Sequence, residues 1–150
     1  MLNEGLNMTG DVLIETYDEY GILKDRREVK NLVVTVGKTF VAASVIKTAN
    51  SPAAMTHMSV GTSTTAAAAG DTALGAEIAG SRTALSSASS SSNVVTYVCT
   101  FPAGTGTGAI TEAGIFNASS GGTMLCHTVF SVVNKASTDA LNITWTVTVN

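Results

Sequence analysis

Charged side chains are scarce in this chain of 150 residues. Only 13% of the residues are charged and 45% are hydrophobic, whereas an average protein has about 25% charged residues. Serine, threonine, glycine, asparagine and alanine must therefore cover the surface, and such a surface is easily buried against another subunit. The composition favours an assembled state, although an ordinary threonine-rich β-domain has the same composition.

A cluster of positive charge is also missing. The net charge is −3 and the isoelectric point is about 5.2, whereas nucleic-acid binding needs clustered lysine and arginine. The most basic stretch, residues 24–30, is interrupted by Asp25 and Glu28. We interpret it as a solvated turn, and we predict no nucleic-acid partner.

The sequence contains neither a long apolar run nor a secretion signal. No stretch approaches the roughly 18 apolar residues of a membrane span, so we predict no membrane partner. Residues 1–5 lack the basic and apolar regions of a signal peptide, and we expect synthesis in a cytoplasm. Disulfides are rare there, so Cys99 and Cys126 are predicted to be buried thiols without a bond between them.

The motifs of catalysis and metal binding are incomplete. The Gly37-Lys38-Thr39 sequence has Leu32 where a P-loop needs its first glycine, and the glycine-rich stretch at 104–108 is followed by Ala109 instead of a third glycine. Neither a metal-ligand spacing nor a nucleophile elbow is present. The side chains that could bind a soft metal are His57, Cys99, Cys126 and His127. We predict no enzyme activity, no catalytic residue, no cofactor and no metal site.

Alternating apolar and polar residues point to strands. In the segment 141–149, Leu141, Ile143 and Trp145 alternate with polar residues, which predicts a half-buried antiparallel strand. Segments 11–17, 94–101, 110–116 and 123–133 also have strand-forming composition. Short strands about ten residues apart indicate a mainly-β fold, which we predict to be a single-domain, antiparallel, jelly-roll-like β-sandwich spanning residues 1–150.

One longer helix is predicted near residues 31–46. Leu32, Val36 and Phe40 recur at helical spacing, and Asn31 can serve as the N-cap. Asparagine, serine and proline at 50–52 end the segment. Strand formers in the same stretch leave a pair of strands as the alternative.

Three segments are predicted to be loops or arms. Residues 62–73 form a low-complexity loop, the serine run at 86–92 forms a flexible loop, and the charged residues 20–30 form an exposed loop or hairpin. We predict that residues 1–10 form a flexible or partner-binding arm. Its apolar residues Leu2, Leu6 and Met8 are the predicted assembly contacts, and a frayed terminus is the alternative.

Three charged residues stand among apolar or glycine neighbours: Glu77, Arg82 and Glu112. Because charges are so few here, these residues are expected to pair with one another across the sandwich or with a neighbouring subunit. We therefore include Arg82 and Glu112 among the predicted assembly contacts. The alternative is an exposed charge that contributes at most about 1 kcal/mol.

Several stretches together resemble small virion structural proteins of tailed bacteriophages. They are Met-Ser-Val-Gly-Thr-Ser-Thr-Thr at 58–65, Asp-Thr-Ala-Leu-Gly-Ala-Glu at 71–77, Ile-Thr-Glu-Ala-Gly-Ile-Phe at 110–116, Gly-Thr-Met-Leu at 122–125 and Leu-Asn-Ile-Thr-Trp at 141–145. The resemblance covers residues 29–149 and implies a scaffold without catalytic residues. In this scaffold Gly61 and Gly114 are expected at strand bends or at positive φ.

The resemblance implies a location in the virion, with the major capsid protein or other virion subunits as partners, and a homo-oligomer. The leading hypothesis is a capsid decoration (cement) protein that binds the outer head shell and stabilises it. The alternative is a tail, baseplate or fibre-attachment component, which the shortness of the chain and its lack of repeats disfavour. A receptor-binding role ranks lower, because only 5% of the residues are aromatic.

Overall fold

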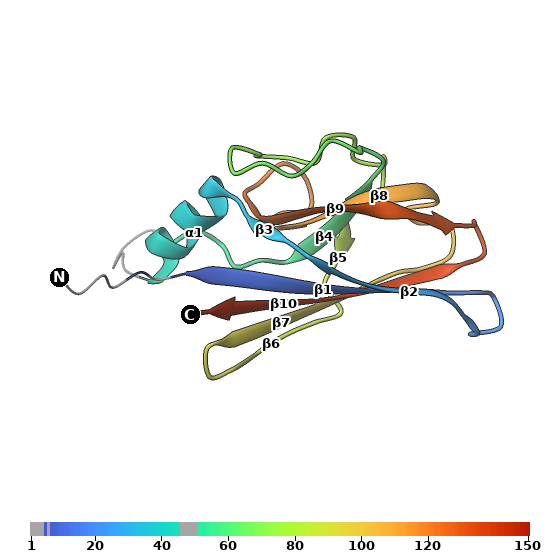
Figure 1. Ribbon diagram of the computed structural model, residues 1–150, viewed down its shortest axis with the longest axis horizontal. Helices are drawn as coiled ribbons and strands as arrows, with labels where there is room; N and C mark the ends of the chain where they lie inside the picture. The colour runs from blue at the N-terminus through green and yellow to red at the C-terminus, as the bar shows by residue number, and fades with distance from the viewer. Residues whose placement is uncertain (1–4, 6, 46–50) are drawn as a thin grey trace.

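The computed structural model describes residues 5, 7–45 and 51–150. Over this part of the chain the protein is mainly β, with 52% strand and 7% helix, and two antiparallel sheets pack face to face (Figure 1). The predicted single-domain β-sandwich is therefore confirmed. No helix in the described residues is long and apolar enough to cross a membrane.

Each sheet has five strands within the described chain. Sheet I has the order β2 (Leu23–Lys30), β1 (Met8–Tyr17), β10 (Ala140–Val149), β7 (Val94–Phe101) and β6 (Ser87–Ser91). Sheet II has the order β3 (Leu32–Val33), β9 (Met124–Lys135), β8 (Gly108–Phe116), β4 (His57–Gly61) and β5 (Thr83–Ala84). The chain passes from sheet I to sheet II between β2 and β3 and again between β7 and β8. It returns to sheet I between β5 and β6 and again between β9 and β10.

The alternation predicted for the last strand is present. Leu141, Ile143 and Trp145 of β10 are fully buried between the sheets, whereas Asn142 and Thr144 face outward and are half-exposed. Trp145 stands level with Val12 of β1 and Tyr97 of β7. These positions form one side of the core, and buried apolar residues of β4, β8 and β9 form the other side.

The helix is shorter than predicted. The expected helix over 31–46 is instead a two-residue strand, β3, followed by α1 (Thr35–Val45), and residue 46 lies outside the described residues. Leu32 and Val33 pair with β9, because the chain crosses here to the edge of sheet II and tertiary pairing outweighs helical spacing. Asn31 is therefore not the N-cap, and the first helical hydrogen bond runs from Lys38 to Val34.

The serine run was wrongly predicted to be a flexible loop. Ser87–Ser91 form β6, which pairs with β7 through a two-residue turn in which Ser92 has φ of 53°. All five residues are exposed, so no alternation of burial marks the strand in the sequence. By contrast, residues 62–73 form the predicted loop, and residues 20–30 form the predicted hairpin. The interpretation of residues 24–30 as a solvated turn is wrong, because they belong to the second strand of this hairpin, β2, which pairs with β1.

The predicted N-terminal arm over residues 1–10 is wrong for residues 8–10, which belong to β1. Met8 starts β1 opposite Val149, and the half-buried Met8 side chain packs against the core. The backbones of Asn7 and Asn150 exchange two hydrogen bonds. Met8 therefore belongs to the sandwich and not to an arm. Leu2 and Leu6 lie outside the described residues.

Candidate functional site

A buried carboxylate lies beneath the loop that covers the outer face of sheet II. Glu112 projects from β8, and its side chain is fully buried. It accepts hydrogen bonds from the backbone N–H groups of Ser63 at 3.2 Å, Gly75 at 2.9 Å and Ala76 at 2.7 Å. One carboxylate thus fixes both ends of the 63–76 loop, and three hydrogen bonds offset the cost of burying its charge.

His127 connects this carboxylate to the tip of the same loop. Its Nε2 lies 3.0 Å from Glu112 Oε2, and its Nδ1 lies 2.7 Å from Asp71 Oδ2. Both ring nitrogens therefore lie within hydrogen-bonding distance of carboxylate oxygens. Asp71 also accepts the N–H of Ala68 at 2.8 Å, and this bond, with the bond from His127, lowers the pKa of Asp71.

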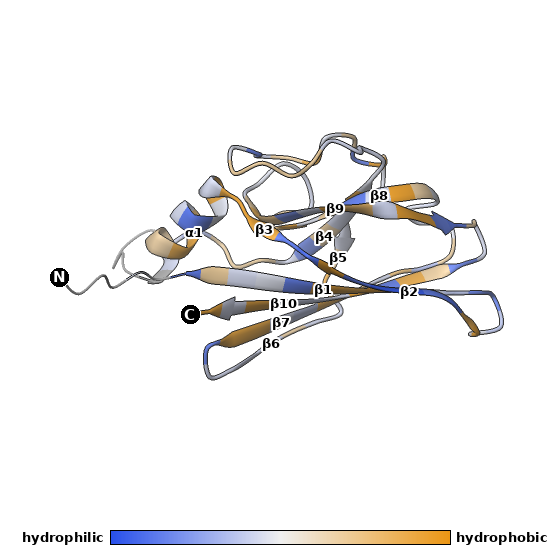
Figure 2. Cartoon of the chain, viewed as in Figure 1, coloured by the Kyte–Doolittle hydropathy of each residue, from blue (hydrophilic) through white to orange (hydrophobic). Residues whose placement is uncertain are grey.

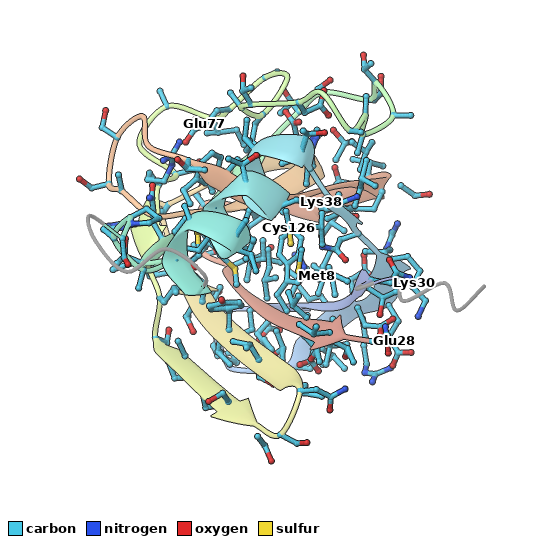
Figure 3. All side chains as sticks on the ribbon, turned by 90° about the vertical axis from the view of Figure 1, so that its left-hand side faces the viewer. Met8, Glu28, Lys30, Lys38, Glu77 and Cys126 are labelled. Carbon is cyan, nitrogen blue, oxygen red and sulfur yellow. The ribbon has the colours of Figure 1, made fainter. Side chains whose placement is uncertain are left out.

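A second polar cluster holds the next part of the loop. The Arg82 guanidinium binds both carboxylate oxygens of Glu77, at 2.8 and 3.0 Å, and donates to the carbonyls of Ala118 and Gly121 at 3.1 Å. It also stacks 3.6 Å from the centroid of the Phe116 ring. The bond from Arg82 lowers the pKa of Glu77, which also accepts a hydrogen bond from Ser59. Figure 3 shows Glu77 above sheet II and Cys126 between the sheets.

These clusters change the roles predicted for the isolated charges. Glu77 and Arg82 pair with each other, but they stand five residues apart along the chain and do not pair across the sandwich as expected; Glu112 pairs with His127 instead of with Arg82. Because Glu112 is fully buried and bound within the subunit, its prediction as an assembly contact is wrong. The Arg82 side chain is 11% exposed and its guanidinium donors bind this same chain; its role as an assembly contact stays a prediction.

Both polar clusters fix the conformation of the loop that covers sheet II. Asp71 and His127 were not singled out from the sequence as partners of Glu112, because nothing in the sequence shows that the 63–76 loop covers sheet II. His127 and Cys126 do point to opposite faces of β9, as predicted, but both are buried. Among the described residues, no group of three or more His, Cys, Asp or Glu side chains is arranged so that it could hold a metal ion.

The two cysteines are free and buried in the described structure. Burial raises the pKa of the Cys99 thiol and that of the Cys126 thiol to about 12 each. Both side chains are therefore protonated thiols at neutral pH, and they contribute to the core as small apolar groups.

Exposed apolar side chains gather at the hairpin tip, which we define as residues 18–23 between β1 and β2. Tyr20 is 80% exposed, Ile22 62% and Leu23 46%. They are three of the four large hydrophobic residues that the described chain exposes, and the fourth is Val132 of β9. The tip projects beyond the sandwich, and Figure 2 shows hydrophobic residues there beside the hydrophilic ones of β2.

Hydrogen bonds fix the conformation of the hairpin tip. Asp18 Oδ1 accepts the N–H groups of Tyr20 and Ile22, both at 2.9 Å, and the Asp18 N–H donates to the Ile22 carbonyl at 2.9 Å. Gly21 has φ of 77°, which glycine adopts without strain. The apolar groups are therefore presented on an ordered turn.

An ion pair next to the tip holds the start of β2 against the end of the sandwich. Lys24 Nζ lies 2.5 Å from Asp139 Oδ2, and Asp139 also accepts the N–H of Ala136 at 2.8 Å. The bond from Lys24 lowers the pKa of Asp139. The charges of this hairpin were recognised in the sequence, but its apolar residues were not, although Tyr20, Ile22 and Leu23 stand together around Gly21.

Comparison with protein families, with curated proteins and with solved structures finds no match to this chain.

Proposed function

We propose that this chain is a bacteriophage virion structural protein, namely a capsid decoration protein that binds the outer head shell and stabilises it. The observation that carries the proposal is the hairpin tip, where Tyr20 and Ile22 are exposed on a turn fixed by Asp18. The resemblance of residues 29–149 to small virion proteins indicates that the assembly is a phage virion. In this proposal, the major capsid protein is the partner.

The tip has the properties of a binding anchor. Tyrosine is enriched among the residues that contribute most to protein interfaces, and an ordered turn loses little conformational entropy on binding. A projecting apolar group fits a pocket on the partner. Asp18 and Glu19 beside it favour a pocket with a basic rim.

The mechanism is passive. Each copy bridges neighbouring subunits of the shell through apolar and backbone contacts, and many repeated sites give a large total stabilisation by multivalency. The two polar clusters support this role, because they hold the 63–82 segment against sheet II and so preserve one shape of the subunit.

The test uses particles of the encoding phage that lack this protein. Purified chain carrying a gold label is added back, and its position and occupancy are measured by electron microscopy. We expect label distributed over the head. The double variant Tyr20→Ser with Ile22→Ser is expected to bind at least about tenfold more weakly, because hot-spot residues contribute about 2 kcal/mol each.

Val132→Ser is the matched control, because Val132 is an exposed apolar residue away from the tip. It is expected to bind like the wild type. Label confined to the tail would overturn the decoration role in favour of a tail or baseplate component. Equal occupancy by the wild type and the tip variant would show that the tip is not the anchor.

A further inference from the structure

Within the described chain, β6 is an edge strand of sheet I that pairs with β7 alone. We propose that β6 pairs antiparallel with β6 of a second copy of this chain, about a two-fold axis at Ser89, and so joins two copies of sheet I into one continuous sheet. This inference concerns contacts between copies and is independent of where the protein binds on a virion.

The two edges of sheet I differ in how they meet solvent. At one edge, β2 carries charged side chains along its length, and Arg27 Nη1 reaches across to the carbonyl of Ser131 in sheet II at 2.8 Å. Charged side chains and cross-sheet contacts of this kind protect an edge from pairing with another strand. At the other edge, the Ser-Ala-Ser-Ser-Ser sequence of β6 has neither a charge nor a proline.

The position of β6 leaves its outer side open. All five of its residues are exposed, and within the described chain they pair with β7 alone. In Figures 1 and 3 the β6–β7 hairpin lies on the side of the molecule opposite the 62–82 loop. A second strand can therefore approach β6 without displacing any element of the fold.

The turn determines which backbone groups face this edge. A two-residue hairpin loop at Ser92 and Asn93 closes on a hydrogen-bonded pair, Ser91 with Val94. Because hydrogen-bonded and non-hydrogen-bonded positions alternate, Ser87 and Ser89 also bond to β7. Ala88 and Ser90 then direct their N–H and C=O groups outward, where the described chain has no strand to receive them.

The segment is complementary to itself. When two β6 strands pair antiparallel about Ser89, Ala88 of each copy stands opposite Ser90 of the other. These are the outward-facing positions, so the pairing forms four backbone hydrogen bonds. The side chains are small and uncharged, so no like charges oppose one another across the pair. A two-fold contact of this kind uses the same patch on both subunits and forms a closed dimer.

Cysteine cross-linking gives a sharp test of the register. Ser89 would face its own copy across the axis as a non-hydrogen-bonded pair, with Cα atoms about 4.5 Å apart, which is within the range of a disulfide. We expect Ser89→Cys to form a disulfide-linked dimer under mild oxidation. The native thiols are buried with raised pKa values. Ser120→Cys, at an exposed turn, is the control and is expected to remain uncross-linked in the same time.

Sedimentation velocity measures the same association without oxidation. The wild type is expected to show a concentration-dependent dimer, and the double variant Ala88→Lys with Ser90→Lys a monomer with an unchanged circular dichroism spectrum. Ser120→Lys is expected to dimerise like the wild type. A wild-type monomer at all concentrations, or Ser89→Cys that cross-links no faster than the control, would overturn the inference. A monomer that still decorates phage heads would overturn this inference alone and leave the proposed function intact.

Discussion

Gly61 and Glu112 lie opposite each other in the β4–β8 pair, and the Glu112 carboxylate occupies the space where a β-carbon on residue 61 would stand. The carbonyl oxygen of Ala76 crowds the same position. The glycine is therefore needed for close approach. It was expected at a strand bend or a positive φ, as was Gly114, but neither has positive φ. A β-carbon on Gly114 would stand only 3.0 Å from Leu74.

Gly61→Ala is expected to destabilise the protein by about 1–3 kcal/mol, the usual cost of overpacking a filled site. The added methyl group must displace the Glu112 carboxylate from the amides that it binds. The free energy of unfolding from urea titration measures the loss. Gly70→Ala is the control, because a β-carbon there meets open space, and it is expected to remain within about 0.5 kcal/mol of the wild type.

Glu112→Ala is expected to free the 63–76 loop without unfolding sheet I. The substitution leaves the N–H groups of Ser63, Gly75 and Ala76 without their acceptor, and an intramolecular hydrogen bond contributes about 0.5–1.5 kcal/mol. Hydrogen exchange should accelerate at these amides more than in β10. If these loop amides exchange no faster in the variant than in the wild type, the role assigned to Glu112 is contradicted.

The parts of the fold that were predictable are those with a periodic pattern of burial. The alternation around Trp145 identified β10, because one face of that strand is buried and the other meets solvent. β6 gave no such signal, since both of its faces are exposed. The Leu32–Val33 strand was hidden within a helical spacing, and only its pairing with Cys126 and His127 defines it.

The candidate site was less predictable than the fold. Scarcity of charge did single out Glu77, Arg82 and Glu112, and all three prove to be bound by other groups of the chain. The partners of Glu112 come from a loop without periodicity and from His127 on β9, so spacing carries no information about them. The reason for Gly37 could not be predicted from spacing either. It costs helix stability, yet a β-carbon there would overlap the backbone of Leu125.

Trp145→Ala is expected to destabilise the protein by about 3–5 kcal/mol, as for other buried aromatic residues. The ring is fully buried among apolar residues of both sheets. Trp145→Phe is the graded control. It keeps an aromatic ring and removes an indole N–H that has no hydrogen-bond partner in the described chain, so its loss should be smaller. An unchanged denaturation midpoint for Trp145→Ala, measured by circular dichroism, would contradict the packing described here.

Acid is expected to weaken the loop contacts through Glu77. The bond from Arg82 holds the pKa of Glu77 below its ordinary value of 4.5. A carboxyl group with a lowered pKa in the folded state stabilises the protein above its unfolded pKa, and this contribution is lost as the pH falls through the folded pKa. The contribution is thus complete at neutral pH and declines below about pH 4.5. Asp71, whose pKa is also lowered, acts in the same direction.

The measurement is the difference in melting temperature between the wild type and Glu77→Gln as a function of pH. The glutamine keeps the size of the side chain and removes the titrating group, so it isolates Glu77 from Asp71. We expect the wild type to melt higher at pH 7 and the two curves to converge as the pH falls below 4.5, the ordinary pKa of this carboxyl group. Glu19→Gln, at the exposed hairpin tip, is the control and should follow the wild type throughout. A difference that persists unchanged into acid would mean that Glu77 contributes through its shape and not through its charge.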